Sequence, residues 1–332
     1  MSDDTGVSDD TGMSDDTGVS DDTGSIARRV TETIPASLAD VRIDRVVSLV
    51  ADVSRSAAAA LIESGAVTLD GQVVTAGKEK VALGQTITVD VAQAAGPELP
   101  QADGSVTLEV VHADDDVIVV NKPAALVVHP GAGNKTGTLV NFLLYAYPEI
   151  AEVGDPLRPG IVHRLDAGTT GLIVVARTQH AYESLVAQLA VRTVSRVYST
   201  LVWGNPVSVN GVIDAPIGRD QRDPTRMAVV VDGKPSRTHY ALEHSYHSPK
   251  DSALLECRLE TGRTHQIRVH LASIGHPVVG DAQYGGVRPG LSPRRPMLHA
   301  RELAFDHPRD GERRTFTAEL PTDFAALLST LS

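Results

Sequence analysis

The chain has 332 residues, 42% of them hydrophobic and 22% charged, which is typical of a soluble globular protein with about two domains. Its single cysteine, Cys257, excludes an internal disulfide framework and predicts a cytoplasmic protein. Residues 197–213 form the longest uncharged stretch and contain Ser, Asn, Gly and Pro, so we expect no membrane span. The net charge of −12 does not by itself exclude an RNA partner, because its location along the chain decides what it means.

Residues 1–24 carry most of that negative charge. They are four copies of a hexapeptide that ends in SDDTG, with eight aspartates and no lysine or arginine. The repeat offers no apolar face to bury, so it predicts a disordered acidic tail rather than a secretory signal. Whether the tail has a function of its own stays open.

Residues 40–92 predict a small domain of two helices followed by a short β-ribbon. Apolar residues recur at helical spacing in its first half, with Asp40 as the expected N-cap of the first helix and Gly65 at the end of the second. Alternating runs around Asp70-Gly71 predict a hairpin. The Ala-, Gly- and Pro-containing residues 93–104 predict a linker.

Residues 105–332 predict an α+β domain with a large mixed, mostly antiparallel sheet and flanking helices. The apolar run 172–176 predicts a buried strand, and Thr178 is the expected N-cap of the helix that follows. A further strand is expected at 194–202 and a helix at 264–274.

The loop at residues 160–171 (GIVHRLDAGTTG) is the strongest local feature. Its glycines and threonines directly precede the buried strand, so they hold Asp166 at the rim of the sheet. A carboxylate placed there has two possible roles. It is either an active-site group or the cap of its own turn.

Two further segments carry candidate functional residues. In 259–270 (LETGRTHQIRVH), Arg263 lies at the mouth of a helix, where it either pairs with a carboxylate or phosphate or points into solvent. On the strand 194–202, Tyr198 lies on the same face as Arg196 and either stacks on a base or packs in the core.

Several common functional signatures are missing from the sequence. It has no phosphate-binding P-loop, no dinucleotide-binding glycine motif and no nucleophile elbow. His265 and His270 are five residues apart, which does not place them on one helix face, and no HExxH motif occurs, so we expect no metal site.

Taken together, these segments resemble the RluA-type pseudouridine synthases, whose signature is centred on the His-Arg-Leu-Asp of 160–171. Further blocks of the family follow in family order at 116–130, 196–198, 233–240, 259–271, 280–286 and 298–300. Residues 40–91 resemble an S4 RNA-binding module. The sequence departs from the family pattern at Ala167-Gly168, where a charged residue and Asp are usual, and at Arg196, where lysine is commoner.

The resemblance implies that uridine in RNA is isomerised to pseudouridine without a cofactor, with 23S ribosomal RNA or a pre-ribosomal particle as partner. It gives Asp166 the role of essential catalytic aspartate, which is consistent with the positive charge that glycosidic bond cleavage builds at C1′. Tyr198 would stack on the target base and help to remove the C5 proton, a role that needs help because free tyrosine has a pKa of about 10. Arg263 would pair with Asp166.

The remaining expected site residues contact RNA. The substrate-binding candidates are His163, Arg164, Arg196, Thr264 and His265, and the candidates in the S4-like module are Arg42, Arg45 and Arg55. We expect a monomer.

Three alternatives remain at this point. The chain could be a catalytically inactive RNA-binding or ribosome-assembly factor, although the retention of Asp166, Tyr198 and Arg263 together favours an enzyme. A glycosidase or nucleoside hydrolase that uses Asp166 would release free uracil. A pseudouridine synthase could also act on transfer RNA.

Overall fold

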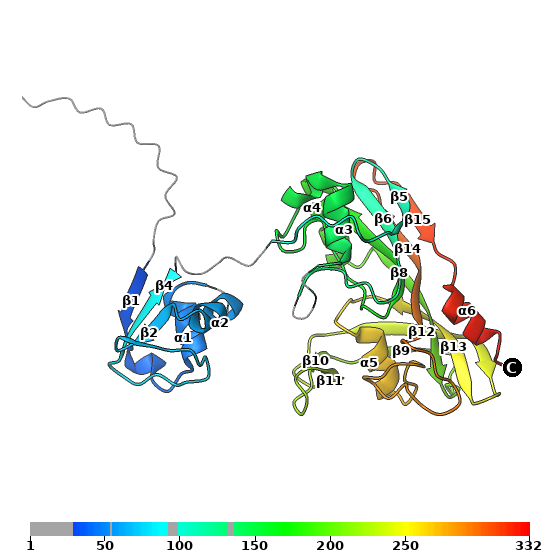
Figure 1. Ribbon diagram of the computed structural model, residues 1–332. Coiled ribbons are helices and arrows are strands. Elements are labelled where there is room, and N and C mark those ends of the chain that lie inside the picture. The colour runs from blue at the N-terminus through cyan, green and yellow to red at the C-terminus, as the bar shows by residue number, and fades with distance from the viewer. Residues whose placement is uncertain (1–28, 54, 92–98, 132–133, 135) are drawn as a thin grey trace, which may run out of the picture. The chain divides into compact units, whose positions relative to one another are not determined.

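The computed structural model describes residues 29–53, 55–91, 99–131, 134 and 136–332 (Figure 1). The predicted acidic tail 1–24 and residues 93–98 of the predicted linker lie outside them. The chain divides into two compact units, with the division between Glu98 and Leu99. None of the helices in this described part of the chain has the length and apolar character that a membrane crossing requires.

The N-terminal unit combines two helices with a sheet. Within the described residues the sheet has four antiparallel strands in the order β1-β4-β2-β3. Its elements are β1 (Arg29–Thr33), the 3-10 helix η1 (Ala36–Leu38), α1 (Ile43–Val50), α2 (Arg55–Glu63), β2 (Val67–Leu69), β3 (Gln72–Val73) and β4 (Thr86–Asp90). β1 lies before the range predicted for this domain and extends the sheet by pairing with β4.

The start of α1 differs from the prediction. Asp40 is not its N-cap, because α1 begins only at Ile43 and Asp40 has a left-handed backbone with φ 62°. The backbone before α1 instead pairs with the segment around Val81, through Asp40 N–H to the Val81 carbonyl (2.8 Å) and Val81 N–H to the Val41 carbonyl (3.0 Å). This tertiary pairing keeps the chain extended up to Arg42.

The core of the N-terminal unit follows the helical spacing of the sequence. Ile43, Val46 and Val47 of α1 are fully buried and pack in one cluster with residues of α2 and the sheet. The predicted Asp70-Gly71 hairpin is present, with φ 51° and 79°, the positive pair that a tight two-residue turn requires.

The C-terminal unit confirms the predicted α+β architecture. Among the residues described from Leu99 onward, nine strands form one sheet in the order β5-β6-β7-β14-β8-β13-β12-β9, with β15 beside β14 (Figure 1). Of the strand pairs that these described residues form in the sheet, only β7–β14 is parallel. β10 and β11 form a separate hairpin.

The bounds of these elements are as follows. The strands are β5 (Glu109–Ala113), β6 (Val117–Lys122), β7 (Thr170–Ala176), β8 (Ser195–Trp203), β9 (Asn210–Asp214), β10 (Ile217–Arg219), β11 (Met227–Val229), β12 (Arg237–Tyr246), β13 (Ser252–Leu259), β14 (Leu298–Asp306) and β15 (Arg313–Thr317). The helices are α3 (Leu139–Ala146), the 3-10 helix η3 (Pro148–Glu152), α4 (Gln179–Ala190), α5 (Gln266–Ser273) and α6 (Thr322–Leu328).

β7 is the buried strand that the sequence predicts, and every one of its residues is buried. Alternate residues of β6 and β7 belong to two different clusters, one shared with α3 and the other with α4, so the two helices cover opposite faces of these strands. Thr178 caps α4 by accepting the Ala181 N–H, as predicted. The sheet is therefore rigid where the 160–171 loop leads into it.

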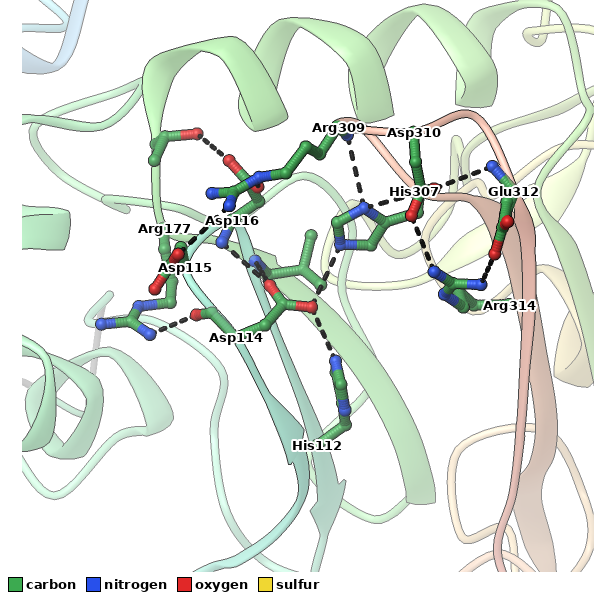
Figure 2. A network of polar contacts seen from close by, with 12 residues as sticks. His112, Asp114, Asp115, Asp116, Arg177, His307, Arg309, Asp310, Glu312 and Arg314 are labelled. Atoms are coloured by element: carbon green, nitrogen blue, oxygen red, sulfur yellow. Dashed lines mark hydrogen bonds and ion pairs between the residues drawn. The ribbon is translucent and has the colours of Figure 1, made fainter.

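A polar network joins the turn between β5 and β6 to the turn after β14 (Figure 2). At its centre, Asp114 Oδ1 accepts the N–H groups of Asp116 and Val117, both at 2.9 Å. Its other oxygen, Oδ2, contacts Nε2 of His112 at 2.7 Å and Nε2 of His307 at 3.1 Å. The network thus connects an edge hairpin to a strand in the middle of the sheet.

This network is better described as ion pairs than as a metal site. The ligand atoms of Asp114, Asp116 and His307 lie within 4.8 Å of one another. However, Asp116 already accepts from Arg309 Nε at 2.6 Å and from the Thr178 hydroxyl at 3.3 Å. Cationic and neutral donors therefore occupy the oxygens that a metal ion would need.

The substitution Asp114→Asn tests the strength of this network. It places an amide NH₂ where two imidazoles meet Oδ2, and we expect it to lower the free energy of unfolding by about 1–2 kcal/mol at pH 7. Burial tends to raise the pKa of Asp114, but hydrogen bonds from His112 and from backbone N–H groups lower it overall. Stability linked to a lowered carboxyl pKa is present above the unfolded-state value, about 3.9, and is lost as the pH falls through the lower folded-state value.

The difference between the wild type and Asp114→Asn should therefore shrink below about pH 4. Urea unfolding followed by the fluorescence of Trp203, the only tryptophan, reports on the C-terminal unit. Asp115→Asn is the control, because this side chain is 80% exposed and we expect a change below about 0.5 kcal/mol. Equal effects of the two substitutions at pH 7 would contradict the role of Asp114.

Candidate functional site

Asp166 lies in the loop that leads into β7 and lines a cleft of about 460 Å³. The loop runs back along β7, where Ile161 pairs with Val175. At the loop's end Gly171 has φ 108°, and a Cβ there would lie 2.2 Å from the Ala300 carbonyl oxygen of β14. Only glycine permits this close approach of β7 to β14, which fixes the end of the loop that carries Asp166.

Arg268 joins Asp166 to a second, buried carboxylate. Its Nη1 donates to Asp166 Oδ2 at 3.0 Å, while Nε and Nη2 donate to the two oxygens of Asp281 at 2.6 and 2.9 Å. Asp281 is fully buried, and the backbone N–H groups of Gln283 and Tyr284 also donate to it, at 3.0 and 3.2 Å. Burial opposes the charge of Arg268, but the two carboxylates outweigh it and raise the pKa of Arg268. The guanidinium is therefore a fixed positive charge beside Asp166.

The arginine that pairs with Asp166 is Arg268 and not Arg263, which the sequence predicted. Arg263 lies before α5 and is exposed, and among the described residues its side chain makes one long hydrogen bond, from Nε to the Pro235 carbonyl at 3.4 Å. It lines the same cleft without pairing with Asp166. Since α5 begins at Gln266, Arg268 lies three residues after His265 and both project toward Asp166. Helical spacing within the motif was the signal that could have identified Arg268.

Lys122, at the end of β6, holds the backbone next to Asp166. Its side chain is fully buried, and Nζ donates to the carbonyls of Pro123 (2.9 Å), Leu126 (2.9 Å) and Ala167 (3.1 Å). Burial lowers the pKa of Lys122 to about 7, although the negative charge of Asp166 acts against this shift. This lysine lies within the family block at residues 116–130, and it was not among the site residues predicted from the sequence.

Gln266 fixes the start of α5. Its Oε1 accepts from the Arg263 N–H at 3.0 Å and from the Thr261 hydroxyl at 2.7 Å. Its Nε2 donates to the Arg237 carbonyl and to the Thr238 hydroxyl, both at 3.0 Å. These contacts tie the loop before α5 to β12, so the helix presents Arg268 to the cleft in one orientation.

Tyr198 and Arg196 line the cleft from β8, and both are buried. Burial raises the pKa of Tyr198 to about 12, with a smaller contribution from Asp166 and an opposing one from Arg196. The phenol is therefore protonated at neutral pH. Arg196 Nη2 reaches the Glu260 carbonyl at 3.4 Å, while its buried Nε has no partner among the described residues.

The other predicted substrate-binding residues divide into two groups. His163 has a structural contact, because its Nε2 accepts the Val174 N–H of β7 at 3.2 Å and burial lowers its pKa to about 3. Arg164 and Thr264 are exposed and line the cleft. Arg164 has no hydrogen-bond or ion-pair partner among the described residues and also borders a smaller adjoining pocket of about 300 Å³.

The cleft is strongly cationic. Its lining includes the arginines Arg158, Arg164, Arg192, Arg196, Arg263 and Arg268. The carboxylates in the lining are Asp166 and Glu260, and Glu260 is held by Arg192 at 2.6 Å. Such a cationic surface attracts an anionic polymer. Because Glu260 is paired with Arg192, Asp166 is the other carboxylate that the lining presents.

The three arginines predicted to bind RNA in the N-terminal unit lie at the surface of its helices. Arg42 directly precedes α1 and contacts Asp44 at 2.7 Å, and Arg55, the first residue of α2, lies 3.7 Å from the same carboxylate. Arg45 is exposed on the first turn of α1. Arg42 and Arg55 thus share one acidic residue, Asp44, which reduces the positive charge that these two side chains offer to a phosphate chain.

Comparison with known families and proteins identifies relatives of both units. The sequence pattern described as RNA pseudouridylate synthase matches residues 116–273, and that of the S4 domain matches residues 41–87. Among solved structures, human RNA pseudouridylate synthase domain containing 1 is 30% identical, with a TM-score of 0.55 over 68% of this chain and 88% of that chain.

Similar full-length proteins are also known. The chain is 45% identical to a protein of Nitrosomonas europaea called ribosomal large subunit pseudouridine synthase D, over 90% of this chain and 87% of that protein. It is 43% identical to a protein of the same name from Pseudomonas aeruginosa, over 90% of this chain and 94% of that protein.

The substitution Arg268→Lys tests the bridge between the two carboxylates. A lysine supplies one point charge and cannot reproduce the fork on Asp281, so this buried carboxylate loses its partner. We expect a loss of about 3 kcal/mol in the free energy of unfolding, measured in urea by Trp203 fluorescence. Arg263→Lys is the matched control, with an expected change below about 0.5 kcal/mol because Arg263 is exposed. A larger effect at Arg263 would show that the bridge is assigned to the wrong arginine.

Proposed function

The chain belongs to the RNA pseudouridine synthase family, and on this premise we propose that it converts specific uridines of large-subunit ribosomal RNA into pseudouridine through Asp166. Two proteins named for large-subunit ribosomal RNA modification are similar to it over about nine-tenths of its length, which supports this substrate class. The S4 domain and the cationic cleft support an RNA partner.

The observation that carries the proposal is the asymmetric environment of the Asp166 carboxylate. Oδ2 is held by Arg268 at 3.0 Å, whereas Oδ1 has no hydrogen-bond donor within 3.5 Å among the described residues. Arg268 thus places a positive charge beside one carboxylate oxygen, and Oδ1 keeps its lone pairs available for the substrate. One oxygen is thus anchored and the other is free to react.

This geometry is suited to reversible cleavage of a glycosidic bond. As the N1–C1′ bond of uridine breaks, positive charge develops at C1′, and Oδ1 either bonds to C1′ or takes the proton from C2′. The base then rotates and C5 bonds to C1′, as the Oδ1–C1′ bond breaks in the first case or the proton returns to C2′ in the second. Finally C5 loses its proton and N1, which left C1′ with the bonding electron pair, gains one. Product and substrate have the same composition, so the reaction balances without a cofactor.

The target nucleotide must leave its helix to reach the cleft, at a cost of a few kcal/mol. Tyr198 offers a buried aromatic face beside Asp166, and stacking on such a face is worth about 1–3 kcal/mol per base. Its pKa of about 12 favours stacking over a role as base for the C5 proton.

The surrounding arginines and one threonine are assigned to the RNA backbone. Arg164, Thr264 and Arg263 lie exposed at the cleft and are placed to contact phosphate or sugar, while Arg196 contributes buried positive charge. Arg42, Arg45 and Arg55 would give the S4 domain a smaller, salt-sensitive contribution to binding.

The decisive experiment uses purified protein, transcribed 23S ribosomal RNA and Asp166→Asn. The wild type should form pseudouridine, and the variant should lose at least about 10³-fold in rate because the charged group is lost. RNA affinity, measured by filter binding, should change less than about 3-fold because the amide keeps the shape of the side chain. Asp251→Asn, an exposed carboxylate outside the cleft lining, is the control that keeps full activity.

Other outcomes identify the alternatives. Release of free uracil would make the protein a hydrolase, and tight RNA binding without product would make it an inactive binding factor. Pseudouridine formed in a transfer RNA pool but not in naked or assembling 23S RNA would overturn the substrate class and keep the reaction.

A further inference from the structure

We infer that His265 is a positioning residue whose proton is fixed on Nε2 by Tyr284, so that this N–H faces Oδ1, the reacting oxygen of Asp166. The inference rests on the proposed function for its catalytic consequence. Its structural part concerns the free protein and stands on the contacts of three side chains.

The backbone places His265 in an unusual conformation. It precedes the first residue of α5 with φ 57° and ψ 20°, a left-handed geometry that costs a residue with a Cβ about 1 kcal/mol or more. The contacts of Gln266 with β12 and with the Thr261 hydroxyl hold this segment in place. The strain is thus imposed by the start of the helix, and it directs the imidazole between Tyr284 and Asp166.

Tyr284 is anchored from several sides. Its hydroxyl accepts the Met227 N–H of β11 at 3.1 Å, and its ring is packed against two guanidinium groups, Arg226 at 5.1 Å and Arg268 at 5.0 Å. The side chain is buried. The hydroxyl therefore has a fixed position and one proton of its own to donate.

The proton of Tyr284 has one acceptor within reach among the described residues, Nδ1 of His265 at 2.8 Å. Because the Met227 N–H already donates to the hydroxyl oxygen, the hydroxyl satisfies both its functions only if it donates to Nδ1. Burial and the charge of Arg268 lower the pKa of His265, while Asp166 and Asp281 act in the other direction, so the ring is neutral at pH 7. A neutral ring with an acceptor at Nδ1 carries its proton on Nε2.

That Nε2–H faces the free side of the catalytic carboxylate. Nε2 lies 3.8 Å from Oδ1, beyond hydrogen-bond distance, while Arg268 holds Oδ2 at 3.0 Å. A donor at this separation does not occupy Oδ1 in the free protein. It steers the carboxylate and can complete a hydrogen bond when the site closes around a nucleotide.

The tautomer is tested directly by nuclear magnetic resonance. Long-range ¹H–¹⁵N correlation of ¹⁵N-histidine-labelled protein identifies the protonated ring nitrogen, and the signals of His265 are assigned by their loss in His265→Gln. We expect Nε2–H in the wild type and a mixture of both tautomers in Tyr284→Phe, which lacks the hydroxyl. An Nδ1–H tautomer in the wild type overturns the inference whether or not the protein is active.

Two isosteric variants separate positioning from packing. The side-chain amide of His265→Gln reaches the place of Nε2, and that of His265→Asn reaches only the place of Nδ1. The rate of a single turnover should stay within about 5-fold for His265→Gln and fall about 50-fold for His265→Asn, with RNA affinity unchanged within about 3-fold, as for a lost transition-state donor. Asn adopts the left-handed backbone more easily than Gln, so backbone strain would produce the opposite order.

If His265→Asn equals or exceeds His265→Gln in rate, the ring serves only the contact with Tyr284 and the inference fails. If the wild-type protein forms no pseudouridine, the proposed function fails instead, while the tautomer measured in the free protein keeps its meaning.

Discussion

The site depends on one guanidinium that bridges two carboxylates. Arg268 is held by the buried Asp281 through two hydrogen bonds and contacts Asp166 with its remaining arm. The two acids have different roles. Asp281 compensates the buried positive charge of Arg268, whereas Asp166 keeps one oxygen without a hydrogen bond among the described residues. Without Asp281, the buried guanidinium would keep Asp166 as its one carboxylate partner among the described residues.

The rest of the fold brings these groups together from distant parts of the chain. Asp166 lies in the loop that leads into β7, where Lys122 holds the Ala167 carbonyl. Arg268 is set by α5, whose start Gln266 ties to β12. The β7–β14 and β8–β14 pairings unite β7, which follows the Asp166 loop, and β8, which carries Tyr198, in one sheet. An extended hydrogen-bonded sheet suits the proposed reaction, in which one carboxylate oxygen meets one sugar.

The strands, helices and loops that carry the site could be predicted from the sequence better than the contacts between their side chains. The apolar run of β7 and the Thr178 cap follow from local patterns, and both were correct. The predicted partner of Asp166 was wrong because the sequence does not show which arginine of the motif is exposed and which is buried. The start of α5 at Gln266 distinguishes the two. Lys122 was missed for a similar reason, since three backbone carbonyls, which carry no sequence signal, keep it buried.

The most direct test of the account is a crystal structure of the protein with an RNA stem-loop whose target uridine carries fluorine at C5. The account predicts the flipped nucleotide against Tyr198, with the C1′–C2′ edge of its sugar facing Oδ1 of Asp166 and Arg268 still on Oδ2. A structure in which Arg268 leaves Asp166 to bind phosphate, or in which the sugar lies elsewhere in the cleft, would contradict it.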